Sequence, residues 1–167
     1  MSTVRKVPVG VILVGVLLTI TGCSGGDSSG AASGPSGASG GTGGEIERVI
    51  LAETEPANAP GQTLYLQEVT IAPGAELPQH FHQGTQVAAV RSGVLTYDIV
   101  SGTAAVTRKG GGTEQIAGPR IITLEPGDSL TETRDLVHYG SNQGDEPVVI
   151  TVAALLRDGA PLATPSP

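Results

Sequence analysis

Three histidines are the residues of this chain whose type and spacing suggest chemistry. His80 and His82 lie two positions apart, His138 is distant in the sequence, and the chain has no other histidine. On an extended strand, side chains at positions i and i+2 point to the same face of the sheet. If that face lines the inside of a barrel, both imidazoles enter one cavity. A histidine from another strand then completes a set of ligands for a transition metal.

The elements that must position these histidines are predicted to be strands. Aromatic residues make up 2% of the chain and there is no tryptophan, so the core must consist of Val, Ile, Leu and Ala. Branched side chains suit a pleated sheet. Short apolar or alternating segments are separated by turn residues such as Ser92-Gly93 and Pro126-Gly127, a pattern typical of an all-β sandwich or barrel. The predicted strands are 47–53, 63–71, 86–91, 94–100, 104–109, 113–117, 120–124, 129–132, 137–142 and 147–156.

The spacing of these residues resembles the two sequence motifs of the cupin family. The first motif has a glycine, a His-x-His pair, a glutamate and a glycine; the second has a glycine, a proline, a glycine, a histidine and an asparagine. The matching positions are Gly74, His80, His82, Gln86 and Gly93, then Gly127, Thr133, Asp135, His138 and Asn142. The resemblance covers about residues 64–156. It implies a single small antiparallel, jelly-roll-like cupin β-barrel that holds one divalent metal ion through His80, His82, Gln86 and His138.

Gln86 departs from the motif in a way that alters chemistry, because a glutamate is usual there. Three neutral imidazoles and a neutral amide leave the full charge on a divalent ion, which favours an anionic ligand. Gln86 either ligates through its carbonyl oxygen or hydrogen-bonds to the ligands, and both alternatives remain open. From the sequence alone, Gln86→Glu is expected to tighten metal binding. The ligand types do not choose between Fe, Mn, Ni, Cu and Zn.

The resemblance leaves two classes of function open. One is a binding module that captures a small polar or anionic molecule. The other is a metal-dependent enzyme, such as an oxygenase, isomerase or lyase, because cupin folds host both. A metal-free barrel whose histidines line a polar pocket is the simpler alternative. Three acidic residues could face the cavity, but no catalytic residue is assigned from the sequence; these acids are Glu76, Asp98 and Glu132. Cupins often pair through edge strands, so a homodimer is a further expectation.

The N-terminal segment predicts export and a lipid anchor. Arg5 and Lys6 precede an apolar run over residues 9–20, which is shorter than the roughly 20 residues that span a bilayer and is typical of a signal peptide. The run ends in Ile20-Thr21-Gly22-Cys23, which resembles the lipobox of bacterial lipoproteins. That resemblance implies cleavage after residue 22 and lipidation of Cys23, the only cysteine of the chain. Two acyl chains suffice for stable anchoring.

The remaining composition completes the predicted domain organisation. A signal peptide at 1–22 is followed by Cys23 and a disordered Gly/Ser-rich linker over 23–44, a barrel over 45–158 and a disordered tail over 159–167. The expected location is the extracytoplasmic face of the cell membrane. Removal of the leader changes the formal charge from −7 to −9, because Arg5 and Lys6 are lost with it. No basic stripe is present to contact phosphates, which argues against nucleic-acid binding.

Overall fold

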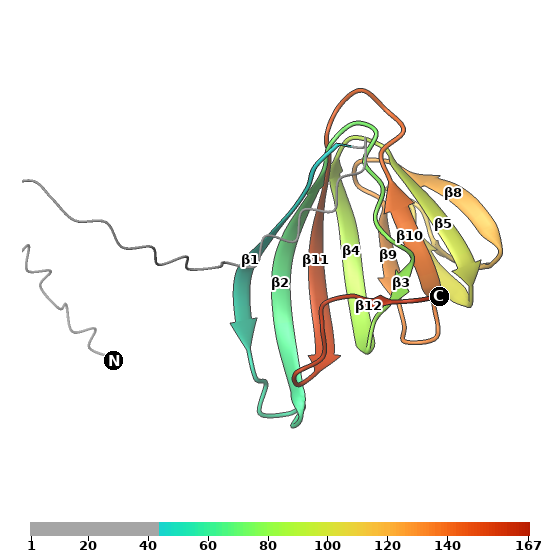
Figure 1. Cartoon of the computed structure of the whole chain (residues 1–167). Helices are drawn as coiled ribbons and strands as arrows, with labels where there is room; N and C mark the ends of the chain where they lie inside the picture. The colour runs from blue at the N-terminus through green and yellow to red at the C-terminus, as the bar shows by residue number, and fades with distance from the viewer. Residues whose placement is uncertain (1–43) are drawn as a thin grey trace, which may run out of the picture. The chain divides into compact units, whose positions relative to one another are not determined.

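The computed structural model describes residues 44–167, and this part of the chain forms twelve strands and no helix (Figure 1). The strands are β1 (Ile46–Thr54), β2 (Gln62–Ile71), β3 (His80–Phe81), β4 (Gly84–Ser92), β5 (Leu95–Ser101), β6 (Thr103–Thr107), β7 (Thr113–Ala117), β8 (Arg120–Leu124), β9 (Ser129–Glu132), β10 (Val137–Ser141), β11 (Val148–Arg157) and β12 (Thr164–Pro165). The prediction of an all-β fold is therefore confirmed.

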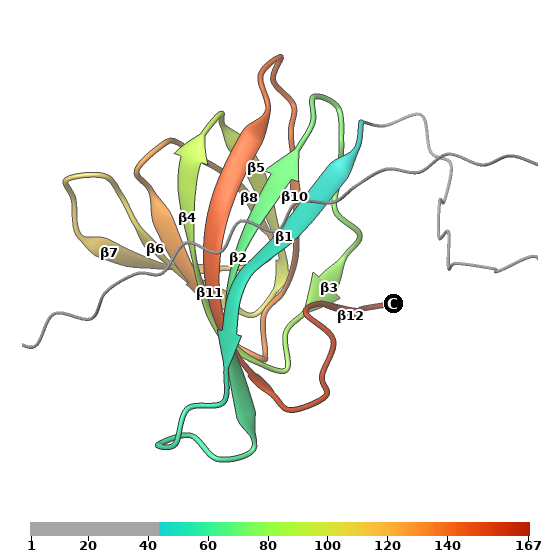
Figure 2. The same ribbon diagram turned by 90° about the vertical axis from the view of Figure 1, so that its left-hand side faces the viewer.

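The strands form two sheets whose neighbours all pair antiparallel. One sheet has seven strands in the order β1-β2-β11-β4-β9-β6-β7, and the other has five in the order β12-β3-β10-β5-β8. Figure 2 shows the larger sheet in front, with β11 near its centre between β2 and β4. Because β3 and β10 lie side by side in the smaller sheet, two histidine-bearing segments become neighbours.

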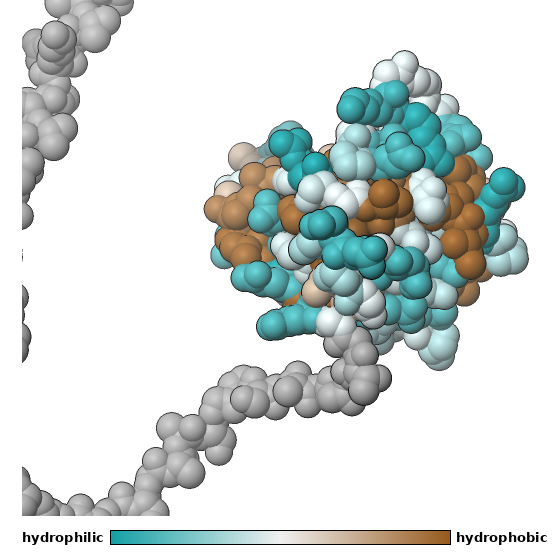
Figure 3. Space-filling view, turned by 90° about the horizontal axis from the view of Figure 1, so that it is seen from above, coloured by the Kyte–Doolittle hydropathy of each residue, from teal (hydrophilic) through white to brown (hydrophobic). Residues whose placement is uncertain are grey.

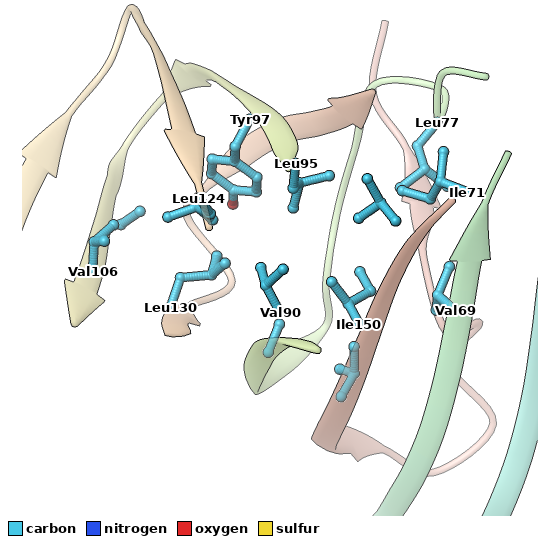
Figure 4. Close-up of a cluster of buried hydrophobic side chains, with 14 of the residues drawn as sticks. Val69, Ile71, Leu77, Val90, Leu95, Tyr97, Val106, Leu124, Leu130 and Ile150 are labelled. Carbon is cyan, nitrogen blue, oxygen red and sulfur yellow. The ribbon is translucent and has the colours of Figure 1, made fainter. Parts of the chain in front are cut away.

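Side chains from both sheets meet in one apolar core (Figure 4). The period-2 pattern of β5 and β11 places every second residue inside, as a pleated strand requires. Ile71 and Ile150 come from the larger sheet, and Ile99 and Leu124 come from the smaller one. Full burial of such a side chain contributes about 1.5–3 kcal/mol relative to exposure. Among residues 44–167, Tyr97 is the only buried aromatic residue of this core, and Tyr65 packs against it from a partly buried position, so the prediction of a mainly aliphatic interior is confirmed.

All ten strands predicted from the sequence are present, and two short strands were missed. These are β3 and β12, whose two-residue lengths leave no alternation to detect. The tail over 159–167 was predicted to be disordered and is instead ordered. Thr164 pairs with Phe81, and the Ser166 amide donates to the carbonyl of Gln79. Hydrogen bonds to the edge of β3 and packing of Leu162 against the core hold the tail in place.

The predicted signal peptide over 1–22, Cys23 and the linker up to residue 43 lie outside the described residues. Among residues 44–167, no helix is long and apolar enough to cross a membrane. The lipid anchor therefore stays a prediction.

One edge of the larger sheet carries exposed apolar side chains. β1 is the terminal strand of that sheet, and β1 and β2 together expose Val49, Ile50, Leu51, Leu64 and Leu66. Figure 3 shows apolar patches between polar ones on the surface of the domain. An unpaired edge with apolar neighbours is suited to pairing with another chain. The homodimer remains a prediction.

Candidate metal centre

The three histidines converge in the interior, as the sequence predicted. His80 belongs to β3, His82 follows it directly, and His138 on β10 pairs in register with His80. The ring centroids are 4.9 Å apart for His80 and His82, 4.5 Å for His80 and His138, and 5.2 Å for His82 and His138. One nitrogen of each ring lies within 4.8 Å of the others, and all three side chains are buried.

Backbone carbonyls fix the orientation of two of these rings. Nδ1 of His80 lies 2.7 Å from the carbonyl oxygen of Pro78, and Nδ1 of His82 lies 2.7 Å from that of Leu162. A carbonyl oxygen can only accept, so in each ring Nδ1 carries the proton and Nε2 keeps its lone pair. Partners of this kind orient histidine ligands in known metal sites. Nδ1 of His138 is buried and has no partner among the described residues.

Burial also favours the neutral form of two of these imidazoles, those of His80 and His82. Desolvation lowers the pKa of His80 to about 4, and repulsion from His138 and His82 acts in the same direction, against the hydrogen bond to Pro78. Desolvation likewise lowers the pKa of His82, although the nearby Glu132 carboxylate opposes the shift. A metal ion binds the neutral ring. At neutral pH, neither ring has to lose a proton first.

We predict that the C-terminal tail contributes to metal affinity. Deletion of residues 160–167 removes the Leu162 carbonyl that orients His82, and loss of such a partner weakens metal binding about 10–100-fold. Chelator competition measures the affinity. Removal of Ser166 and Pro167 alone is the matched control, since it spares the contact to His82. Equal affinity of the longer deletion and the intact chain would contradict the prediction.

Gln86 also lies in this cluster, where its amide makes two polar contacts. Its Nε2 donates to Oε2 of Glu132 and lies 2.7 Å from Nε2 of His82. Its Oε1 is buried and has no partner among the described residues. The side chain is 6% exposed, so the structure brings it together with the histidines, as the motif implied.

Glu132 on β9 was one of three acids that the sequence named for the cavity, without a role in the site, and the structure places it among the histidines. Its carboxylate accepts from the hydroxyl of Tyr97 at 2.7 Å, and the residue is 3% exposed. Burial opposes ionisation, but His138, His82 and the Gln86 amide outweigh it and hold the pKa of Glu132 below its usual value. Glu132 is two positions from the core residue Leu130, and that period-2 relation could have placed it inside.

The other polar candidates lie outside the cluster. Asp98 accepts from the hydroxyl of Tyr139 at 2.9 Å, and Glu76 is exposed. Asn142 closes a turn, because its side chain donates to the carbonyls of Ile71 and Glu146. Of the three acids named from the sequence, only Glu132 lines the cavity.

The histidines line a small cavity with polar and apolar walls. The volume in which the centre of a water molecule fits is about 40 Å³. This space accommodates a few water-sized groups. The polar lining residues beyond the histidines are Arg48, Gln67, Gln86, Tyr97 and Glu132. Arg48 pairs in register with the buried Val69, so its side chain extends over the inner face of the sheet.

Residues 67–154 match the family described as the cupin domain. The chain belongs to the cupin family. The matched region contains His80, His82 and His138 together with Gln86 and Glu132. No curated protein matches this cupin.

Solved structures similar to this cupin include two other cupin proteins. A cupin superfamily protein from Desulfitobacterium hafniense is 12% identical, with a TM-score of 0.48, 70% of this chain covered and 83% of that one. A cupin 2 domain-containing protein from Halorhodospira halophila is 16% identical, with a TM-score of 0.48 and coverages of 72% and 68%. A recombinant oxalate oxidase in complex with glycolate is 20% identical, with a TM-score of 0.45 and coverages of 70% and 52%.

The residues of this cupin fit a divalent transition metal. Three buried imidazoles present nitrogen ligands toward one another, and two of them keep Nε2 lone pairs available. Histidine nitrogens bind such ions at about 2.0–2.1 Å, so modest ring rotations would bring the three nitrogens into coordination range. The three histidines could therefore hold a metal ion.

Proposed function

We propose that this cupin is a membrane-anchored extracytoplasmic lipoprotein whose barrel binds one divalent transition metal ion and, beside it, a small anionic molecule. The convergence of His80, His82 and His138 carries the metal-binding part of the proposal. Burial of three imidazoles costs free energy that apolar side chains at the same positions would not cost. A shared metal ligand would offset this cost. The ion would be Fe, Mn, Ni, Cu or Zn, since imidazole suits each of them.

Arg48 and the size of the cavity support a small anion as the second ligand. The residues that line the cavity carry one guanidinium, on the exposed residue Arg48, and one carboxylate, so a bound divalent ion leaves an excess of positive charge. Gln67 is 1% exposed, and its Oε1 has no partner among the described residues, so it offers a polar contact. The open volume of about 40 Å³ admits only a few heavy atoms. A short carboxylate suits this space.

The metal content of the purified full-length protein tests the proposal. We expect near one first-row divalent ion per chain by elemental analysis of protein from its own host, or after titration of the metal-free form. The bound ion should then increase the affinity for a short carboxylate such as acetate or glycolate, measured by calorimetry. Protein that neither carries nor takes up a metal would contradict the proposal.

Binding is favoured over catalysis by the state of Glu132, the one carboxylate among residues 44–167 that lines the cavity. Each oxygen of Glu132 accepts one hydrogen bond, from Tyr97 or Gln86, and also faces an imidazole of the cluster, so the carboxylate belongs to the internal network of the site and is not directed at a substrate. Oxygen consumption of the metal-loaded protein with small diketones, phenols and thiols distinguishes the two classes. Metal-dependent turnover in that screen would favour the enzymatic alternative.

The proposed location depends on the predicted lipid anchor at Cys23, which can be tested separately. Cys23→Ser removes the thiol that would receive the lipid, so we expect the variant to leave the membrane fraction or to be mislocalised. Fractionation followed by a high-salt wash is the measurement, and Ser24→Ala is the neighbouring control. Continued membrane association of Cys23→Ser after the wash would argue against lipidation.

A further inference from the structure

The carboxylate of Glu132 lies where a ligand of the metal ion would be placed. Its Oε1 is 3.1 Å from Nε2 of His138, and its Oε2 is 3.4 Å from Nε2 of His82. Two ligands of one ion with bonds of about 2.1 Å are separated by about 3.0 Å in octahedral geometry and about 3.4 Å in tetrahedral geometry. The contacts of Glu132 with both imidazoles fall in this range.

The hydrogen bonds around Glu132 leave this coordination possible. Tyr97 donates to Oε1 and Gln86 donates to Oε2. Nε2 of His138 also lies 3.1 Å from Oε1, and a metal ion bound to that nitrogen would replace any proton there. A carboxylate oxygen has about two lone-pair sites, so each oxygen retains one for a cation. Partners of this kind orient carboxylate ligands in known metal sites.

The orientation of Gln86 argues against that side chain as the fourth ligand. Its amide nitrogen faces both Oε2 of Glu132 and Nε2 of His82. Rotation of the amide to present Oε1 would bring two acceptors together at Glu132, which is unfavourable in a buried site. An amide N–H is a donor and does not ligate a metal ion. On metal binding, Gln86 would give up its contact with His82 and keep the one with Glu132.

The register of the larger sheet places Gln86 and Glu132 directly opposite each other. Gln86 on β4 pairs directly with Glu132 on β9, and both side chains are buried on the same face. We propose that Glu132 supplies the anionic metal ligand of this cupin from β9, and that Gln86 on β4, at the position of the motif's glutamate, holds that carboxylate in place. The inference rests on the proposed metal binding. It means that the site keeps one carboxylate, carried by the neighbouring strand.

A charge swap between the two positions tests this inference. In the full-length protein, Glu132→Gln removes the charge at constant shape, and we expect metal affinity to fall about 10–100-fold in chelator competition with Zn²⁺. The double variant Gln86→Glu/Glu132→Gln restores one carboxylate beside one amide, and we expect most of the lost affinity to return. Glu125→Gln, at an exposed position outside the cavity, is the matched control.

Two outcomes would overturn the inference. Unchanged affinity of Glu132→Gln would show that Glu132 is not a ligand. A weakened single variant that the swap fails to rescue would show that Glu132 acts through the structure and not through its charge. Either result leaves the proposed function intact if the wild-type protein still binds metal, whereas a wild-type protein without metal binding defeats both.

Infrared spectroscopy gives a second readout that needs no variant to fold. The difference spectrum between the metal-free and the Zn²⁺-loaded wild-type protein should contain a shifted carboxylate band, because coordination alters both carboxylate stretches. The absence of that band at full Zn²⁺ occupancy would also overturn the inference.

Discussion

Replacement of His138 by alanine is expected to reduce the metal content of the purified protein from near one ion per chain to near zero. His138 is the only histidine on β10, and it lies against both His80 and His82. Loss of a group that hydrogen-bonds to a metal ligand lowers metal affinity about 10–100-fold, and loss of the ligand itself should lower it further. Elemental analysis and chelator competition measure the effect.

A neighbouring residue provides the control for this variant. Tyr139 follows His138 but faces the other way, where its hydroxyl donates to Asp98. Tyr139→Phe should therefore keep its metal while disturbing the same strand. Metal retained by His138→Ala, or lost equally by Tyr139→Phe, would count against a site built on the three imidazoles.

Replacement of Gly93 by alanine is expected to lower the free energy of unfolding by about 2 kcal/mol or more. Gly93 has a φ of 70°, a conformation that L side chains rarely adopt. A Cβ there would lie 2.7 Å from the carbonyl oxygen of Pro147 and 2.9 Å from Cα of Val148. The backbone at the start of β11 would therefore have to move. Denaturant unfolding of the metal-free protein measures the effect without a contribution from ligand binding.

Gly110 distinguishes the cost of the positive φ from the cost of the steric clash in the stability loss expected for Gly93→Ala. Its φ is 71°, but nothing lies within 4 Å of a Cβ built there. Gly110→Ala should therefore cost only the conformational part, about 1–2 kcal/mol. A loss for Gly93→Ala no larger than that of Gly110→Ala would mean that the close approach to β11 is relieved without cost.

The histidine cluster and most of the strands could be predicted because both depend on local patterns. Side chains two apart on an extended segment share a face, which places His80 and His82 together. The alternation of apolar residues marked strands such as 94–100 and 147–156, since a sheet buries every second residue. Gly93 was identified by its place in the motif, and its positive φ gives the physical reason.

The contacts of Glu132 and of the tail depend on pairing across the sheets, which no local pattern encodes. Glu132 faces Gln86 because β9 lies beside β4 in one register, and a shift by one residue would turn it outward. The Leu162 carbonyl reaches His82 across 80 positions in the sequence. The Pro-rich composition of the tail predicted disorder. Composition carries no information about the edge of β3, with which the tail pairs in the structure.

The strand order has a consequence for how the nascent chain acquires this architecture. β11 is inserted between β2 and β4, so the middle of the larger sheet cannot be completed until residues 148–157 have left the ribosome. Until then, the facing edges of β2 and β4 have no partner. Such non-local pairing implies a high contact order and slow folding. Polypeptides released before residue 148 would expose the unpaired edges of β2 and β4. They should aggregate and not form a smaller barrel.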